Sequence, residues 1–87
     1  MMLEFESKEI KKFALNYRAL IDERWHEVYR VDNFHGFLHE QRFWRSPKPI
    51  PLEENRSLNF VVEHHVNEIT INFPRYRKYF EEMMKKR

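Results

Sequence analysis

The amino-acid sequence predicts an α+β domain in which an antiparallel three-stranded meander is covered on one face by C-terminal helices. Three observations carry this prediction. Apolar and polar residues alternate through the first half of the chain, turn residues separate the alternating runs, and apolar residues recur every three or four positions in the second half. Because the strands precede the helices, the helices are expected to pack as one layer on the sheet.

The three expected strands cover residues 11–21, 25–32 and 37–45. Asp22-Glu23-Arg24 forms the first short turn. Asn33-Phe34-His35-Gly36 forms the second, because Asn favours local backbone hydrogen bonds and Gly36, the only glycine, accepts positive φ. The proline-rich stretch "SPKPIP" then ends regular structure.

The second half of the chain predicts two helices. An apolar stripe at offsets of three and four favours a helix over residues 54–69, although "EITINF" also alternates like a strand and leaves residues 58–73 ambiguous. A second amphipathic helix is expected to begin at Pro74, which suits a first-turn position, and to end in "KKR".

Composition describes a single small domain over residues 1–87. Aromatic residues make up 16% of the chain, which predicts a core built from large rings. One glycine, no cysteine and many ion-pairing side chains would suit a protein from a thermophile. The net charge of +2 is too small to establish a nucleic-acid partner by itself.

The absence of cysteine excludes a disulfide scaffold, a thiolate nucleophile and a thiolate zinc site. No apolar stretch is long enough to cross a bilayer, and the N-terminus lacks a signal-peptide core. A cytoplasmic location, no membrane partner and no cofactor are therefore expected.

The second turn is expected to gather polar side chains on one face of the sheet. A four-residue turn pairs Asp32 with Phe37, Arg30 with His39, Val28 with Gln41 and His26 with Phe43. His35 then lies at the rim of an open face that carries His26, Arg30, Asp32, His39 and Gln41. Trp25, Tyr29 and Trp44 lie on the opposite face, which is expected to take the helices. A turn of three or five residues would separate Arg30 from His39.

These polar residues also have structural interpretations. Asp32 and Asn33 are ordinary turn residues, and Arg30 with His39 is equally consistent with a cross-strand pair on a solvated face. Asp32, His35 and His39 form a candidate metal-ligand set, because a His-x3-His spacing is familiar from zinc sites. That spacing brings two rings together on a helix, whereas Gly36 and the alternation favour a strand. No metal is therefore expected.

The stretch "RVDNFHGFLHEQ" resembles the Arg-Tyr-Asp-Asn…His-Gly…His signature of TumE-like toxins of prokaryotic toxin–antitoxin pairs and of related small proteins of unknown function. The matching residues are Arg30, Asp32, Asn33, His35, Gly36 and His39, while Val31 replaces the usual Tyr. The upstream "NYRALIDERWHEVYR" is similar to the opening hairpin of that family. The resemblance implies a toxin-like protein with an antitoxin partner.

Two function classes follow. A metal-independent ribonuclease needs a base, an acid and a cation for the phosphate. His35 and His39 are the expected acid–base pair, Arg30 the cation, and Asp32 the residue that orients one imidazole. The alternative is a non-enzymatic module that binds nucleic acid or protein. A metal-dependent hydrolase, the third option, would be inhibited by chelators.

Three further residues are expected to contact nucleic acid, with RNA as the candidate ligand: His26, Gln41 and Arg45. A homodimer is also expected, formed by an edge strand or by the C-terminal helix, because the chain is small and rich in aromatic residues. Cleft geometry discriminates the classes, since a catalytic pair must reach one phosphate and a binding module needs only a broad positive surface.

Overall fold

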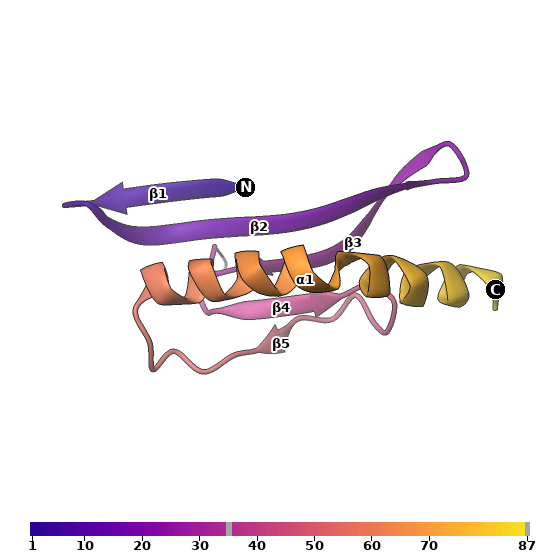
Figure 1. The fold of residues 1–87 in the computed structure, drawn as a ribbon. Helices are drawn as coiled ribbons and strands as arrows, with labels where there is room; N and C mark the ends of the chain where they lie inside the picture. The colour runs from indigo at the N-terminus through magenta and orange to yellow at the C-terminus, as the bar shows by residue number, and fades with distance from the viewer. Residues whose placement is uncertain (35, 87) are drawn as a thin grey trace.

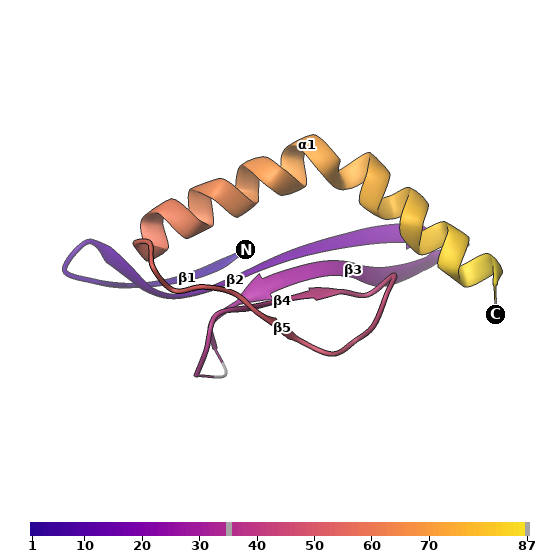
Figure 2. The ribbon, with the colours of Figure 1, turned by 90° about the horizontal axis from the view of Figure 1, so that it is seen from below.

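A computed structural model describes residues 1–34 and 36–86 and has the predicted α+β class. Five strands form one antiparallel sheet in the order β1-β2-β3-β4-β5, and one long helix packs on one face of it (Figure 1, Figure 2). The elements are β1 (Met2–Glu6), β2 (Glu9–Ile21), β3 (Arg24–Asp32), β4 (His39–Arg42), β5 (Ile50–Pro51) and α1 (Leu58–Lys85).

The expected meander forms the centre of this sheet, and the number of strands was underestimated. β2 and β3 confirm the first two predicted strands. The predicted third strand is too long, because β4 ends at Arg42, whose carbonyl oxygen accepts the amides of Arg45 and Ser46 in a tight turn. β1 and β5 were not predicted. β1 is mostly exposed and β5 has only two residues, so neither has a strong alternating pattern.

Two tight hairpins set the geometry of the first three strands. Each has a two-residue loop with both residues at positive φ: 51° and 67° at Ser7-Lys8, and 52° and 66° at Asp22-Glu23. Such loops are type I′ turns, whose twist matches that of the paired strands. Gly36, at φ +88°, also has the positive φ that the sequence predicts.

A β-bulge in β3 changes which residues face α1. Tyr17 pairs with Tyr29 and Arg18 with Glu27, so Val28 is an extra residue in β3. Beyond this bulge the alternation is inverted. His26 therefore lies on the helix side, with its ring centroid 5.3 Å from that of Phe80, and is not on the open face as predicted.

Trp25, expected beneath the helix, is instead 69% exposed. The period-two pattern alone could not locate the bulge, because Val28 and Tyr29 are both acceptable strand residues. The other predicted aromatic positions hold, since Tyr29 is buried and Trp44 packs against the core.

One helix replaces the two that were expected. α1 begins after Ser57, whose hydroxyl accepts the amide of Phe60 at 3.2 Å, and it continues through Pro74. Pro74 cannot donate a hydrogen bond to the preceding turn, and Figure 2 shows α1 bent along its length with its concave side toward the sheet. The predicted apolar stripe is confirmed at Val61, Val62 and Phe80, which are buried.

The core lies between α1 and the sheet in two adjoining clusters. The larger cluster lies under the N-terminal half of α1, and its buried members are Ile10, Phe13, Leu15, Tyr29, Val31, Leu38, Val61 and Val62. The smaller cluster lies at the hairpin end and contains Ala19, Ile21, Val28 and Phe80. The bend in α1 lets one helix cover both clusters of the twisted sheet.

Candidate functional site

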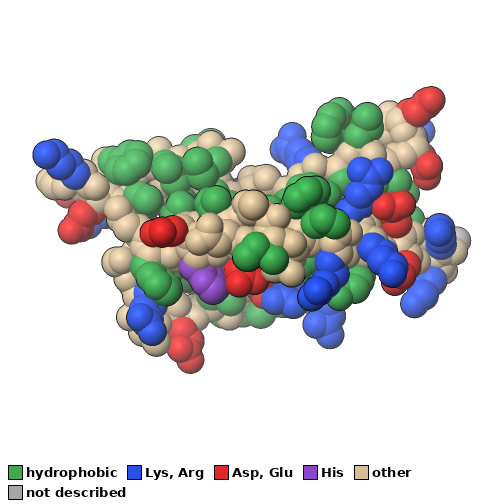
Figure 3. Space-filling model, in the orientation of Figure 1, with side chains coloured by type: hydrophobic (Ala, Val, Ile, Leu, Met, Phe, Trp, Pro, Cys, Tyr) green, Lys and Arg blue, Asp and Glu red, His purple; other side chains and the backbone are tan. Residues whose placement is uncertain are grey.

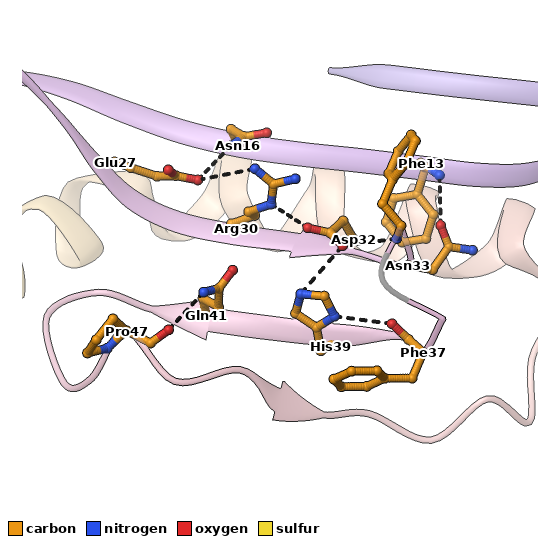
Figure 4. Close-up of polar contacts among 11 residues, drawn as sticks. Phe13, Asn16, Glu27, Arg30, Asp32, Asn33, Phe37, His39, Gln41 and Pro47 are labelled. Atoms are coloured by element: carbon orange, nitrogen blue, oxygen red, sulfur yellow. Dashed lines mark hydrogen bonds and ion pairs between the residues drawn. The ribbon is translucent and has the colours of Figure 1, made fainter.

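The predicted polar residues of β3 and β4 meet on the sheet face opposite α1 (Figure 4). Asp32 pairs with His39 and Arg30 with Gln41, so the register is two residues away from the expected one. The connection between β3 and β4 is longer than the four residues predicted. Because the shift is an even number, Arg30, Asp32, His39 and Gln41 still share one face.

Asp32 is the centre of this polar cluster. One carboxylate oxygen accepts Nε of Arg30, while the other accepts the Phe34 amide at 3.1 Å and lies 3.4 Å from Nε2 of His39. Burial acts to raise the pKa of Asp32, but the hydrogen bonds from Arg30 and Phe34, together with the nearby charges of Arg30 and His39, outweigh it. The pKa therefore lies below the ordinary 3.8, and Asp32 is a carboxylate.

His39 is held equally firmly. Its Nδ1 lies 3.1 Å from the carbonyl oxygen of Phe37, and the Phe37 ring centroid is 4.8 Å from that of the imidazole. Asp32 is 0% exposed and His39 is 2% exposed. The expectation that the side chains of Asp32 and His39 are exposed on an open face is therefore wrong. His35, the other predicted acid–base residue, lies outside the described residues.

Asn33 fastens the segment that follows Asp32. Its side-chain oxygen accepts the Phe13 amide at 2.9 Å, and its side-chain nitrogen donates to the Lys11 carbonyl at 3.0 Å. The Asn33 amide also donates to the Phe13 carbonyl at 3.3 Å. Together with Asp32, these contacts anchor the start of the β3–β4 connection on β2. Much of the Arg-Tyr-Asp-Asn…His-Gly…His signature therefore has a structural role.

Beyond Asp32 the cluster becomes more exposed. Arg30 lies 3.8 Å from the Glu27 carboxylate, which also accepts the side-chain amide of Asn16 at 2.6 Å. Gln41 donates to the carbonyl of Pro47 at 2.8 Å. The side chains of Arg30 and Glu27 both reach solvent, with 28% and 31% of their surface exposed.

The three residues predicted to contact nucleic acid do not form one surface. His26 faces α1, Gln41 lies on the open face, and Arg45 lies in the turn after β4. Of the three, only Arg45 lines a groove, which has a volume of about 620 Å³ and runs between that turn and the C-terminal half of α1. Figure 3 shows Lys and Arg side chains gathered over this half of α1.

Cationic and aromatic side chains dominate this groove. Its cations are Arg42, Arg45, Arg75 and Lys86, and its acids are Glu68 and Glu82. Trp44, Tyr76 and Tyr79 supply rings, with the Trp44 centroid 4.9 Å from Tyr76 and 5.7 Å from Tyr79. The groove was not predicted from the sequence, although "FPRYRKYF" interleaves basic and aromatic residues and contributes three of its lining residues.

A partly buried chain of polar side chains borders the groove beneath α1. Arg42 donates to Glu40 at 3.0 Å, and the Tyr29 hydroxyl donates to the other Glu40 oxygen at 2.6 Å. The Tyr29 oxygen also lies 3.4 Å from Nδ1 of His65. Burial, together with the bond to Glu40, raises the pKa of Tyr29 far above its ordinary value. Tyr29 is therefore a permanent donor that fixes Glu40, and Glu40 in turn fixes Arg42.

Within residues 1–34 and 36–86, no group of three or more His, Asp or Glu side chains is arranged to hold a metal ion. The candidate set of Asp32, His35 and His39 is only partly covered by this finding, because His35 is not described. In the same part of the chain, no helix is long and apolar enough to span a membrane.

A family model described as "Domain of unknown function (DUF7718)" matches residues 1–86. The chain belongs to this family. The searches of curated proteins and of solved structures found no match. The matched region is nearly the whole chain, so it includes both the Asp32 cluster and the groove.

Proposed function

We propose that this DUF7718 protein is an RNA-binding module that holds single-stranded RNA in the groove between α1 and the turn after β4. The observation that carries the proposal is the combination of four cations with three aromatic rings along one groove. Proteins that bind single strands use cations to follow the phosphates and aromatic rings to stack the bases. Tyr79 is 39% exposed, so part of its surface is open to a base.

Preorganisation supports this assignment. Glu40 holds Arg42, and Trp44 packs against Tyr76, so these groove residues are already fixed before any ligand binds. Fixed side chains lose less conformational entropy when a ligand is captured. The Asp32 cluster is less suited to contact RNA, because Asp32 and His39 are buried.

The experiment measures binding of a labelled single-stranded RNA by fluorescence anisotropy. Tyr79→Ala removes a stacking ring and is expected to weaken binding by roughly 5-fold or more. Arg75→Ala is expected to weaken it and to reduce its salt dependence by about one phosphate contact. Lys78→Ala is the matched control, because Lys78 is an exposed cation of the same helix that does not line the groove.

Equal losses in Arg75→Ala and Lys78→Ala, with binding by Tyr79→Ala unchanged, would show that only net charge matters and would contradict the groove assignment. An absence of RNA binding at low salt would contradict the function itself. Circular dichroism of each variant confirms that α1 is intact, so that a loss of binding is not a loss of fold.

A second candidate is a growth-inhibiting toxin of a toxin–antitoxin pair that cleaves RNA without a metal. The motif resemblance favours it, as does the group in which Arg30 is hydrogen-bonded to Asp32 and His39 lies 3.4 Å from the same carboxylate. In this mechanism His35 and His39 exchange protons with the RNA, Arg30 holds the phosphate and Asp32 orients His39. Because His39 is buried, the β3–β4 connection must move before cleavage.

Expression in a bacterial host tests the toxin directly. Growth arrest that a neighbouring gene relieves, and that Arg30→Ala abolishes, is the expected result. RNA cleavage by the purified protein should survive EDTA, because no metal takes part. Normal growth and intact RNA under all conditions would leave only the binding module.

A further inference from the structure

The acidic residues in the groove need an explanation if its ligand is RNA. A phosphate backbone is repelled by carboxylates, yet Glu68 and Glu82 line the groove with the four cations. A carboxylate can nevertheless accept hydrogen bonds from the donor groups on base edges. An acidic side chain among aromatic rings is therefore suited to read a base.

Glu68 has the better position for this role. Along α1, Glu68, Asn72 and Tyr76 follow one another at four-residue intervals, so they lie on one flank of the helix, one turn apart. Trp44 packs against Tyr76, with an interplanar angle of 23°. Glu68 lines the same groove as this ring pair, and after burial its charge is the strongest influence that raises the pKa of Tyr76.

The Glu68 carboxylate is also held in place. Nδ2 of Asn72 donates to the Glu68 carbonyl oxygen at 2.9 Å and to Oε2 of the Glu68 side chain at 3.2 Å. The bond from Asn72 uses one lone pair of Oε2, and each carboxylate oxygen can accept two hydrogen bonds. The carboxylate is thereby oriented as a double acceptor in the groove that also holds Trp44 and Tyr76.

We propose that the groove prefers guanine, and that Glu68 determines this preference by accepting the N1–H and N2–H groups of the base. This inference rests on the proposed function. Guanine is the only common base whose Watson–Crick edge presents two adjacent donors, which match the two oxygens of one carboxylate. Adenine and cytosine each place an acceptor beside their amino group, and that acceptor would face a carboxylate oxygen. Uracil presents one donor between two acceptors.

The test compares labelled oligouridylate with versions that carry one central guanine, adenine or cytosine. The guanine oligonucleotide is expected to bind about 10-fold more tightly than the other three, a typical discrimination for a bidentate contact to a base edge. Glu68→Gln replaces one acceptor by a donor, and should abolish the preference while changing oligouridylate binding less than about 2-fold. Glu82→Gln, the matched control in the same groove, should keep the preference.

Equal binding of the four oligonucleotides by the unmodified protein would overturn the guanine assignment and leave the RNA-binding function standing. The guanine assignment is also overturned if Glu68→Gln keeps the preference, or if adenine or cytosine is favoured. Failure of all four to bind would overturn both proposals together.

Discussion

Among single residues, His39 differs most from its prediction, because it was expected on an exposed face and is buried. A histidine on a solvated face could be replaced at a cost below about 1 kcal/mol. The observed side chain is buried, lies 3.4 Å from an Asp32 carboxylate oxygen and packs against Phe37. His39→Ala is therefore expected to lower the free energy of unfolding by about 2 kcal/mol, because it removes a partner of a buried carboxylate.

Chemical denaturation measures this loss. Gln41→Ala is the control, because Gln41 lies next but one along β4 on the same face and bonds only a loop carbonyl in an exposed position. It should cost less than about 1 kcal/mol. If His39→Ala costs no more than Gln41→Ala, the Asp32 cluster does not anchor the fold.

His65 makes stability depend on pH. Burial, followed by the nearby charge of His64, lowers its pKa below the ordinary 6.5, although Glu40 and Glu68 oppose the shift. A lowered folded pKa gives stability that is present above pH 6.5 and is lost as the pH falls through the folded value. The free energy of unfolding should therefore decline as the pH falls below about 6.5, and less steeply in His65→Gln than in His64→Gln. If the free energy of unfolding falls equally steeply with pH in the two variants, the decline does not arise from His65.

At the scale of elements, the turns hold the clearest opportunity for stabilisation. Asp22 and Glu23 both have positive φ, which is unfavourable for residues other than glycine. Glu23→Gly gives the sequence Asp-Gly, which is strongly preferred in type I′ turns. We expect the free energy of unfolding to rise by about 0.5–1 kcal/mol, measured by denaturation, whereas Glu23→Ala should give no gain. A loss of stability in the glycine variant would contradict the turn assignment.

The helices and strands that could be predicted from the sequence are those determined by a local pattern of residues. β2, β3 and the α1 stripe follow from periodicity, and Gly36 follows from turn chemistry. The bulge at Val28 does not, because it arises from how two strands pair and not from either sequence alone. That one residue reversed the predicted positions of His26 and Trp25.

The candidate sites, too, could be predicted only where they follow from local sequence pattern. The meeting of Arg30, Asp32 and His39 was predictable, because an even change of register keeps strand residues on one face. Their burial was not, since the β3–β4 connection and Phe37 supply it. The groove could not be located either, because it requires the turn after β4 to lie against a part of α1 that is more than 20 residues further along the chain.

At the scale of the whole molecule, self-association remains a prediction. β1 pairs with β2 only as far as Ala14, so in the described structure residues 15–21 of β2 are paired by β3 alone. Next to this edge, Phe73 contacts Tyr17 and is 46% exposed. Unpaired strand edges with exposed apolar residues favour association. We expect light scattering to give twice the chain mass of 11.0 kDa, and a monomer at tens of micromolar would contradict this.

The central claim, that RNA lies in the groove and not on the open face, is tested most directly by nuclear magnetic resonance. Amide resonances of the isotope-labelled protein are followed while a short single-stranded RNA is added. We expect shifts concentrated in residues 42–45 and 72–86, which include most of the groove lining, with little change in Arg30, Asp32 and His39. Shifts concentrated on Arg30, Asp32 and His39, with the groove unchanged, would contradict the claim.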